Sequence, residues 1–151
     1  MHDFIDLVEL LNEEKAIYLV VGSFAMAHHG YVRATGDIDL FVEPHFANSE
    51  KVYRALKRFG APCEAHGISE SYFATAGNFY QLGLPPNRID ILTQISGLSF
   101  QEAAQSGVHG LLGKVPLHYL GLAELVKNKL AAGREKDLLD AAELKKRMAG
   151  A

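Results

Sequence analysis

Three aspartates lie in segments whose apolar pattern is typical of β-strands. Asp37 and Asp39 alternate with apolar residues in DIDLFV, and Asp90 lies in the middle of RIDIL. Residues i and i+2 of a strand point to the same face, so Asp37 and Asp39 should share one face. If the strand that holds Asp90 lies beside them, all three carboxylates converge. Carboxylates repel one another and hard divalent cations prefer oxygen ligands, so the pattern predicts a site for two Mg²⁺ (or Mn²⁺) ions about 4 Å apart.

Isolated aspartates also have structural explanations. Asp37 is compatible with a helix cap or a turn, and Asp90 is compatible with a salt bridge to Arg88 or Arg33. A charge buried in a strand is costly unless it is paired or bound to a metal. Both explanations therefore stay open for Asp90.

An anion-binding turn is predicted just upstream of the acids. Gly22 and Ser23 lie between a strand-like apolar run and a helix of small residues at 24–29. A glycine lets the backbone approach a phosphate closely, and the hydroxyl and N–H of Ser23 can donate to it. Arg33 and Thr35 precede the acidic strand, where a guanidinium can make charge-assisted bonds to a triphosphate. The alternatives are a turn in which Ser23 caps the helix, worth about 1 kcal/mol, and a solvated loop arginine. A metal site beside an anion turn favours a nucleoside triphosphate as the ligand.

Basic residues gather near the end of the chain, in two predicted helices broken at Gly133. Such charge runs usually form a solvated helical face. Lys129 differs, because its apolar neighbours at helical spacing should bury part of its stem. Asp137 and Asp140 are expected to pair with the basic residues as helix-start charges.

Other chemistries lack their motifs. His28 and His29 are adjacent, so on a helix they point about 100° apart and are expected to be structural rather than joint metal ligands. Cys63 is the single cysteine, which excludes an internal disulfide and a Cys-rich zinc site, and we expect a buried or incidental thiol. Ser23 lacks the Gly-x-Ser-x-Gly elbow of an acyl-transfer nucleophile.

Length and composition predict one compact domain over 1–151. An apolar fraction of 48% with 22% charged residues is ordinary for a globular protein. The net charge of −3 argues against broad nucleic-acid binding, which normally requires a basic face. The acidic N-terminus predicts no signal peptide, and the longest apolar run is too short to span a bilayer. We therefore expect a cytoplasmic protein that does not bind membranes.

The hydrophobic periodicity predicts an α/β (α+β) fold in which a mixed β-sheet is flanked by helices. The chain divides into an α/β core over about 1–118 and a C-terminal helical segment over about 119–149. Two short edge strands are predicted around a loop, at 64–67 and 71–75. The other predicted strands are 17–21, 37–42, 79–84, 88–92 and, on an edge because of its proline, 114–118. The predicted helices are 3–14, 24–29, 49–59, 100–105, 120–132 and 135–148.

These motifs together resemble the nucleotidyltransferase fold shared with DNA polymerase beta. Within that superfamily they are most similar to small stand-alone proteins related to the nucleotidyltransferase half of abortive-infection toxin–antitoxin pairs. The resemblance covers about 18–144. The segments that carry it are Gly22-Ser23, His29-Gly30, Arg33-x-Thr35-x-Asp37-Ile38-Asp39-Leu40, Asp90, and Lys129-Leu-Ala-Ala-Gly-Arg134-x-Lys136-Asp137-x-x-Asp140.

The resemblance implies magnesium-dependent transfer of a nucleoside monophosphate from a nucleoside triphosphate to an acceptor hydroxyl. It implies that Asp37 and Asp39 bind both metals, and that Asp90 binds the catalytic metal and helps to activate the acceptor. Gly22 and Ser23 would hold the β- and γ-phosphates, with Lys129 and either Arg33 or Arg134 neutralising them.

The acceptor is not identified by the sequence, and a tRNA end or other RNA, a partner protein and a small molecule all remain candidates. The alternative to an enzyme is a nucleotide- or partner-binding module of a toxin–antitoxin-type pair, with a small helical protein as its partner and little or no turnover. The helices at each end of the chain are also compatible with a homodimer.

Overall fold

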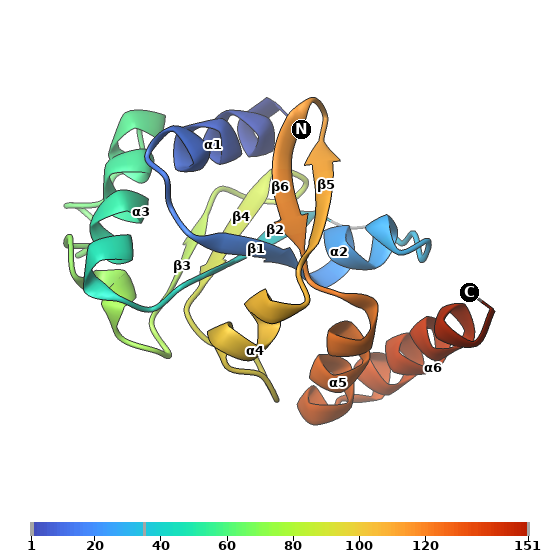
Figure 1. Ribbon diagram of the computed structural model, residues 1–151. Coiled ribbons are helices and arrows are strands. Elements are labelled where there is room, and N and C mark those ends of the chain that lie inside the picture. The colour runs from blue at the N-terminus through green and yellow to red at the C-terminus, as the bar shows by residue number, and fades with distance from the viewer. Residues whose placement is uncertain (1, 35, 151) are drawn as a thin grey trace.

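A single mixed sheet forms the centre of the protein in a computed structural model that describes residues 2–34 and 36–150 (Figure 1). Within these residues the sheet has six strands in the order β3-β4-β2-β1-β6-β5. The pairs β1/β6 and β2/β4 are parallel, and the other neighbours are antiparallel. The strands are β1 (Tyr18–Val21), β2 (Asp37–Val42), β3 (Phe79–Leu82), β4 (Arg88–Leu92), β5 (Val108–Leu112) and β6 (Val115–Tyr119). The predicted α+β class with a mixed sheet is confirmed.

Helices lie on both sides of this sheet. Helices α1 (His2–Glu13) and α3 (Phe46–Phe59) lie on one side, and α4 (Phe100–Gln105), α5 (Leu122–Ala132) and α6 (Glu135–Gly150) lie on the other (Figure 1). Helix α2 (Gly22–His28) follows directly from β1, and a 3-10 helix spans Tyr72–Ala74. Among the described residues, no helix is both long enough and apolar enough to cross a membrane.

The main core lies between the sheet and the α1/α3 layer. Leu7 and Leu11 of α1 are fully buried, as is Leu56 of α3. Ile38 on β2 and Ile91 on β4 are also buried, at alternating positions of their strands. Because side chains alternate across a strand, Asp39, next to Ile38, and Asp90, next to Ile91, point to the opposite face. The acid-bearing face of β2 and β4 is therefore the face turned away from the main core.

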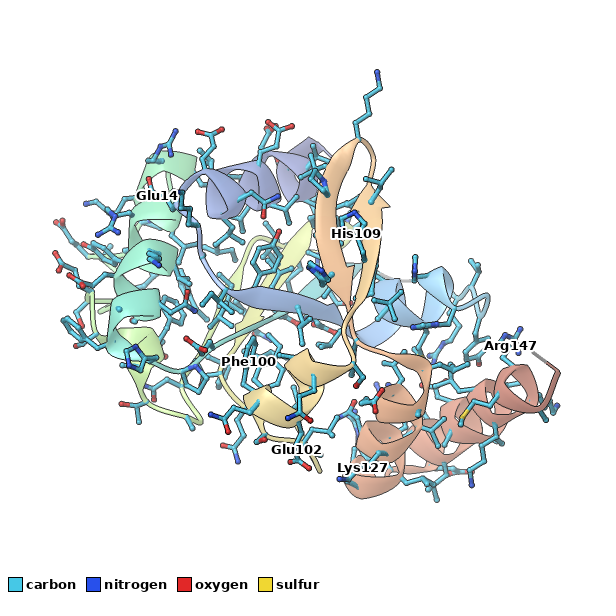
Figure 2. All side chains as sticks on the ribbon, viewed as in Figure 1. Glu14, Phe100, Glu102, His109, Lys127 and Arg147 are labelled. Atoms are coloured by element: carbon cyan, nitrogen blue, oxygen red, sulfur yellow. The ribbon has the colours of Figure 1, made fainter. Side chains whose placement is uncertain are left out.

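The opposite layer is attached by a few specific contacts. Phe100 at the start of α4 packs edge-to-face on Phe41 of β2, with ring centroids 5.0 Å apart. Lys127 of α5 points toward Glu102 of α4 and pairs with it at 3.4 Å (Figure 2). Gly133 ends α5 with a φ of 70°, as the predicted break between the last two helices requires. The first two contacts join α4 to the sheet and α5 to α4.

The predicted helix start, with Ser23 as the N-cap of a helix over 24–29, is wrong by two residues. Helix α2 begins at Gly22, and its N-cap residue is Val21, which makes no side-chain capping bond. Ser23 therefore lies inside the first turn, and within the described residues its hydroxyl has no hydrogen-bond partner. The capping explanation for this serine does not hold.

The predicted edge strands are also corrected. The segment 64–67 forms turns, and 71–75 contains the 3-10 helix. Strand β5 was not predicted, because Gly110 interrupts its apolar pattern. Strand β6 lies inside the sheet, between β1 and β5, rather than at an edge. Pro116 is tolerated there because β6 pairs with β1 only at Tyr119, so the proline needs no bond from that side.

The two adjacent histidines have structural contacts, as predicted. The ring of His28 stacks on Tyr119 with centroids 4.3 Å apart. The Nε2 atom of His29 lies 2.9 Å from the carbonyl oxygen of Leu120. Cys63 is buried, again as predicted.

Candidate functional site

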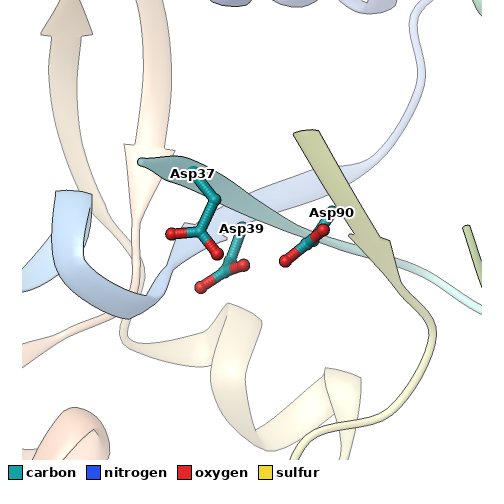
Figure 3. Close-up of side chains that lie close together, drawn as sticks. All are labelled: Asp37, Asp39 and Asp90. Carbon is teal, nitrogen blue, oxygen red and sulfur yellow. The ribbon is translucent and has the colours of Figure 1, made fainter. Parts of the chain in front are cut away.

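The three predicted aspartates converge on one face of the sheet (Figure 3). Strands β2 and β4 are parallel neighbours, and Asp39 pairs in register with Asp90. Asp37 lies two residues before Asp39 and shares its face. One oxygen from each carboxylate can be chosen so that all three lie within 4.8 Å of one another. The predicted convergence is confirmed, and the oxygens are close enough to share a cation.

Burial makes two of these carboxylates, Asp39 and Asp90, more difficult to ionise. Asp90 is 6% exposed, and burial raises its pKa despite the opposing effect of Arg88. Burial, together with the charges of Asp37 and Asp90, raises the pKa of Asp39 to about 7. Within the described residues, Oδ1 of Asp90 accepts no hydrogen bond. A divalent cation among the three carboxylates would relieve their repulsion.

Arg88 already supplies one positive charge to this cluster. Its Nη2 atom lies 2.7 Å from Oδ2 of Asp37, and its Nε atom lies 3.3 Å from Oδ1 of Asp90. The salt bridge from Asp90 to Arg88, one of the two structural explanations, is therefore present, whereas Arg33 pairs with Asp140 instead. One guanidinium cannot neutralise three carboxylates. The cluster keeps an excess of negative charge when all three are ionised.

Gly22 lies in direct contact with the acidic cluster. Its φ is +64°, and a Cβ atom placed on it would lie 2.2 Å from Oδ2 of Asp39. Any other residue here would both strain the backbone and displace that carboxylate. Gly22 was predicted to let the backbone approach a phosphate closely. The structure adds a second reason for glycine here, which is that it leaves space for the Asp39 carboxylate.

Basic side chains line the side of the site opposite the three acids. These basic side chains form ion pairs with two buried carboxylates of α6. Lys129 is 14% exposed, and its Nζ atom lies 3.5 Å from Asp137 and 3.3 Å from Asp140. Arg33 contacts Asp140, and the Nε atom of Arg134 lies 2.6 Å from Asp137. The predicted pairing of these acids with basic residues is confirmed. Asp137 lies in the first turn of α6, whereas Asp140 lies beyond it.

These groups surround a cavity of about 490 Å³, which we call the acidic cavity. Every predicted site residue that the structure describes lines it: Asp37, Asp39, Asp90, Gly22, Ser23, Arg33, Lys129 and Arg134. Thr35, the remaining predicted residue, lies outside the described residues. Arg88, Lys136 and Asp140 also line the cavity and were not predicted as site residues. For Arg88 a signal was available, because it lies two residues before Asp90 in the same strand and must share its face.

The arrangement brings together oxygen ligands for a hard cation and cations for an anion. Comparison of the sequence with protein-family models and with curated proteins finds no match. The resemblance to nucleotidyltransferases therefore rests on the motif residues of the sequence alone.

Proposed function

We propose that this protein is a Mg²⁺- or Mn²⁺-dependent nucleotidyltransferase that moves a nucleoside monophosphate from a nucleoside triphosphate to an acceptor hydroxyl. The observation that carries the proposal is the convergence of Asp37, Asp39 and Asp90, with ligand oxygens within 4.8 Å of one another, in a cavity whose other wall is cationic. Three acids in one place, of which Asp90 is buried and Asp37 and Asp39 are half-buried, are costly unless a cation joins them.

The residues present fit a divalent cation. Asp37, Asp39 and Asp90 would hold it, and Oδ1 of Asp90, which lies 3.3 Å from Arg88 but accepts no hydrogen bond within the described residues, offers a ligand atom. When bound, the metal would stabilise the negative charge that develops on the transferred phosphoryl group. Because Gly22 has no side chain, the Asp39 carboxylate has the space to lie where it could bind the cation.

The side chains of the cavity suit each part of the transfer. The acceptor oxygen forms a bond to the α-phosphorus as the bond to the β-phosphate oxygen breaks, and pyrophosphate leaves with that electron pair. Asp90, the most buried acid of the three, would accept the acceptor's proton. The free hydroxyl of Ser23 would donate to the leaving phosphates, and Lys129 and Arg33 would neutralise them.

Label transfer tests the proposed reaction directly. The protein is incubated with Mg²⁺ and each nucleoside triphosphate labelled at the α- or γ-phosphate, together with RNA, protein or small-molecule acceptors. We expect transfer of the α-label with release of pyrophosphate, and loss of transfer in Asp37→Asn/Asp39→Asn. Asp3→Asn/Asp6→Asn, which changes the charge equally at exposed positions of α1, is the control and should transfer normally. Transfer of the γ-label instead, or equal transfer by the Asp37→Asn/Asp39→Asn variant, would refute the proposal.

A second candidate is a nucleotide- or partner-binding module of a toxin–antitoxin-type pair, with a small helical partner. It is favoured by Arg88, whose guanidinium lies 2.7 Å from Asp37 and 3.3 Å from Asp90 and so partly replaces a metal. For such a module, nucleotide binding should persist in EDTA and no label should be transferred. Measuring both quantities on the same preparation separates the two candidates.

A further inference from the structure

A second cavity, of about 460 Å³, adjoins the acidic cavity. The two cavities share four lining residues, Gly22, Asp39, Lys129 and Arg134. A molecule that occupied both would therefore pass between Asp39 on the sheet and Lys129 on α5. We call the second cavity the neutral cavity, because Asp137 is its only charged lining residue among the described residues beyond those it shares.

Two apolar side chains line the neutral cavity on the same face of the sheet as the acids. Leu92 lies two residues after Asp90 on β4, so their side chains point the same way. Phe79 on the edge strand β3 pairs in register with Leu92. Although Phe79 is a large aromatic residue, it is 55% exposed. The Phe79 ring is thus a largely exposed flat surface, which lies beside Leu92, the next residue after Asp90 on the same face of β4.

Apart from Asp137 and the residues shared with the acidic cavity, the polar side chains of the neutral cavity are uncharged. Among the described residues, the side chains of Gln94 and Ser96 make no hydrogen bond, so both remain able to donate and accept. The Asn128 amide of α5 donates to the backbone carbonyl oxygen of Ser96 at 2.9 Å, which ties this segment to α5. Thr93 is buried, and its hydroxyl accepts from the N–H of Gly77 at 3.0 Å. A cavity lined by free amide and hydroxyl groups suits a flat, neutral, hydrogen-bonding ligand.

We propose that the neutral cavity binds the nucleoside of the nucleoside triphosphate, with the base against Phe79 and its polar edge within reach of Gln94 and Ser96. This inference rests on the proposed function. The nucleoside is joined to the α-phosphate, which must lie at the acids, and Asp39 is the acid that lines both cavities. An acceptor hydroxyl must instead reach Asp90, which lines the acidic cavity and not the neutral one. The acceptor therefore enters through the acidic cavity.

Calorimetric titration with two kinds of ligand tests this assignment. Each of the four nucleoside triphosphates, and inorganic tripolyphosphate as a ligand without a nucleoside, is titrated with Mg²⁺ into the native protein, Phe79→Ala and Gln94→Ala. Phe46→Ala is the matched control, because Phe46 is equally exposed, at 53%, but lies on α3. We expect Phe79→Ala to weaken nucleoside triphosphate binding about fivefold or more, the usual effect of losing one stacking partner, and to leave tripolyphosphate binding unchanged. Gln94→Ala should alter the order of preference among the four bases.

Each other outcome has a defined meaning. If the native protein binds tripolyphosphate as tightly as the nucleoside triphosphates, no nucleoside contact exists and the assignment is overturned. If Phe79→Ala weakens the binding of both ligands equally, the substitution acts on phosphate binding, and the assignment is overturned too. Unchanged nucleotide binding with impaired label transfer would assign the neutral cavity to the acceptor instead. If the native protein binds neither ligand, the proposed function itself fails, and this result is distinct from the other three.

Discussion

Replacing Gly22 with alanine should disable the acidic site while leaving the fold largely intact. An alanine Cβ would lie 2.2 Å from Oδ2 of Asp39, whereas real Cβ contacts are essentially never shorter than 3.0 Å. The carboxylate must therefore move by about 0.8 Å, several times the roughly 0.2 Å that a metal–ligand distance tolerates. We expect the affinity for Mg²⁺ with a nucleoside triphosphate to fall about 10- to 100-fold or more, since even an outer-sphere ligand contact is worth that much.

The same substitution also strains the backbone, and Gly67 provides the control for that effect. Gly67 has a φ of +74°, close to the +64° of Gly22, but a Cβ there would meet no atom within 4 Å. Both alanine variants should lose about 1–2 kcal/mol of unfolding free energy in urea titrations because of the left-handed conformation. Only Gly22→Ala should lose ligand affinity in calorimetry. If Gly22→Ala binds as tightly as Gly67→Ala, the inferred contact between Gly22 and a functional Asp39 is refuted.

Three further changes test the electrostatics of the site. The pKa of Asp39 is raised to about 7 from an ordinary 3.8, so protonation of Asp39 stabilises the folded state. This contribution to the unfolding free energy is complete below pH 3.8 and is lost as the pH rises through 7. The metal-free melting temperature should therefore fall over this range, and a slope unchanged in Asp39→Asn would contradict the assignment. Asp140→Asn leaves Lys129 without one of its buried partners, so the unfolding free energy should fall by about 2 kcal/mol, against less than about 0.5 kcal/mol for the control Glu143→Gln, whose side chain is 38% exposed; equal losses would argue against a role for burial. Arg88→Met removes the only guanidinium within 4 Å of the three acids among the described residues, so Mg²⁺ should raise its melting temperature more than that of the native protein, and an equal rise would show that Arg88 does not neutralise the cluster.

The convergence of the acids could be predicted because it depends on local pattern. Alternation fixes the faces of Asp37, Asp39 and Asp90 within their own strands. Their apolar neighbours Ile38 and Ile89 are both buried and pair in register, and this aligns the two strands so that the acids share the other face.

Features that depend on distant contacts could not be predicted. The need for glycine at position 22 comes from the position of the Asp39 carboxylate, which the local sequence does not reveal. Strand β5 contains Gly110 where a strand pattern calls for a larger side chain. A Cβ at Gly110 would lie 2.8 Å from the Tyr119 ring and 2.9 Å from the His28 ring. The stacking of those two rings therefore requires glycine at position 110.

The buried state of the α6 acids was also hidden from the sequence. Asp137 and Asp140 follow a glycine break and resemble ordinary helix-start charges. Only the packing of α6 against α5 places them beneath Lys129, where both become almost fully buried. Their role in holding the cationic wall is therefore a property of the tertiary structure.

The central claim is that the three acids form a metal-dependent nucleotide site. Its most direct test is isothermal titration of the native protein and of Asp37→Asn/Asp39→Asn with each nucleoside triphosphate, in Mg²⁺ and in EDTA. We predict binding by the native protein in Mg²⁺ and its loss both in EDTA and in the double variant, while Asp3→Asn/Asp6→Asn binds normally. Binding of equal strength in the double variant, or no binding by the native protein to any of the four nucleotides, would contradict the claim.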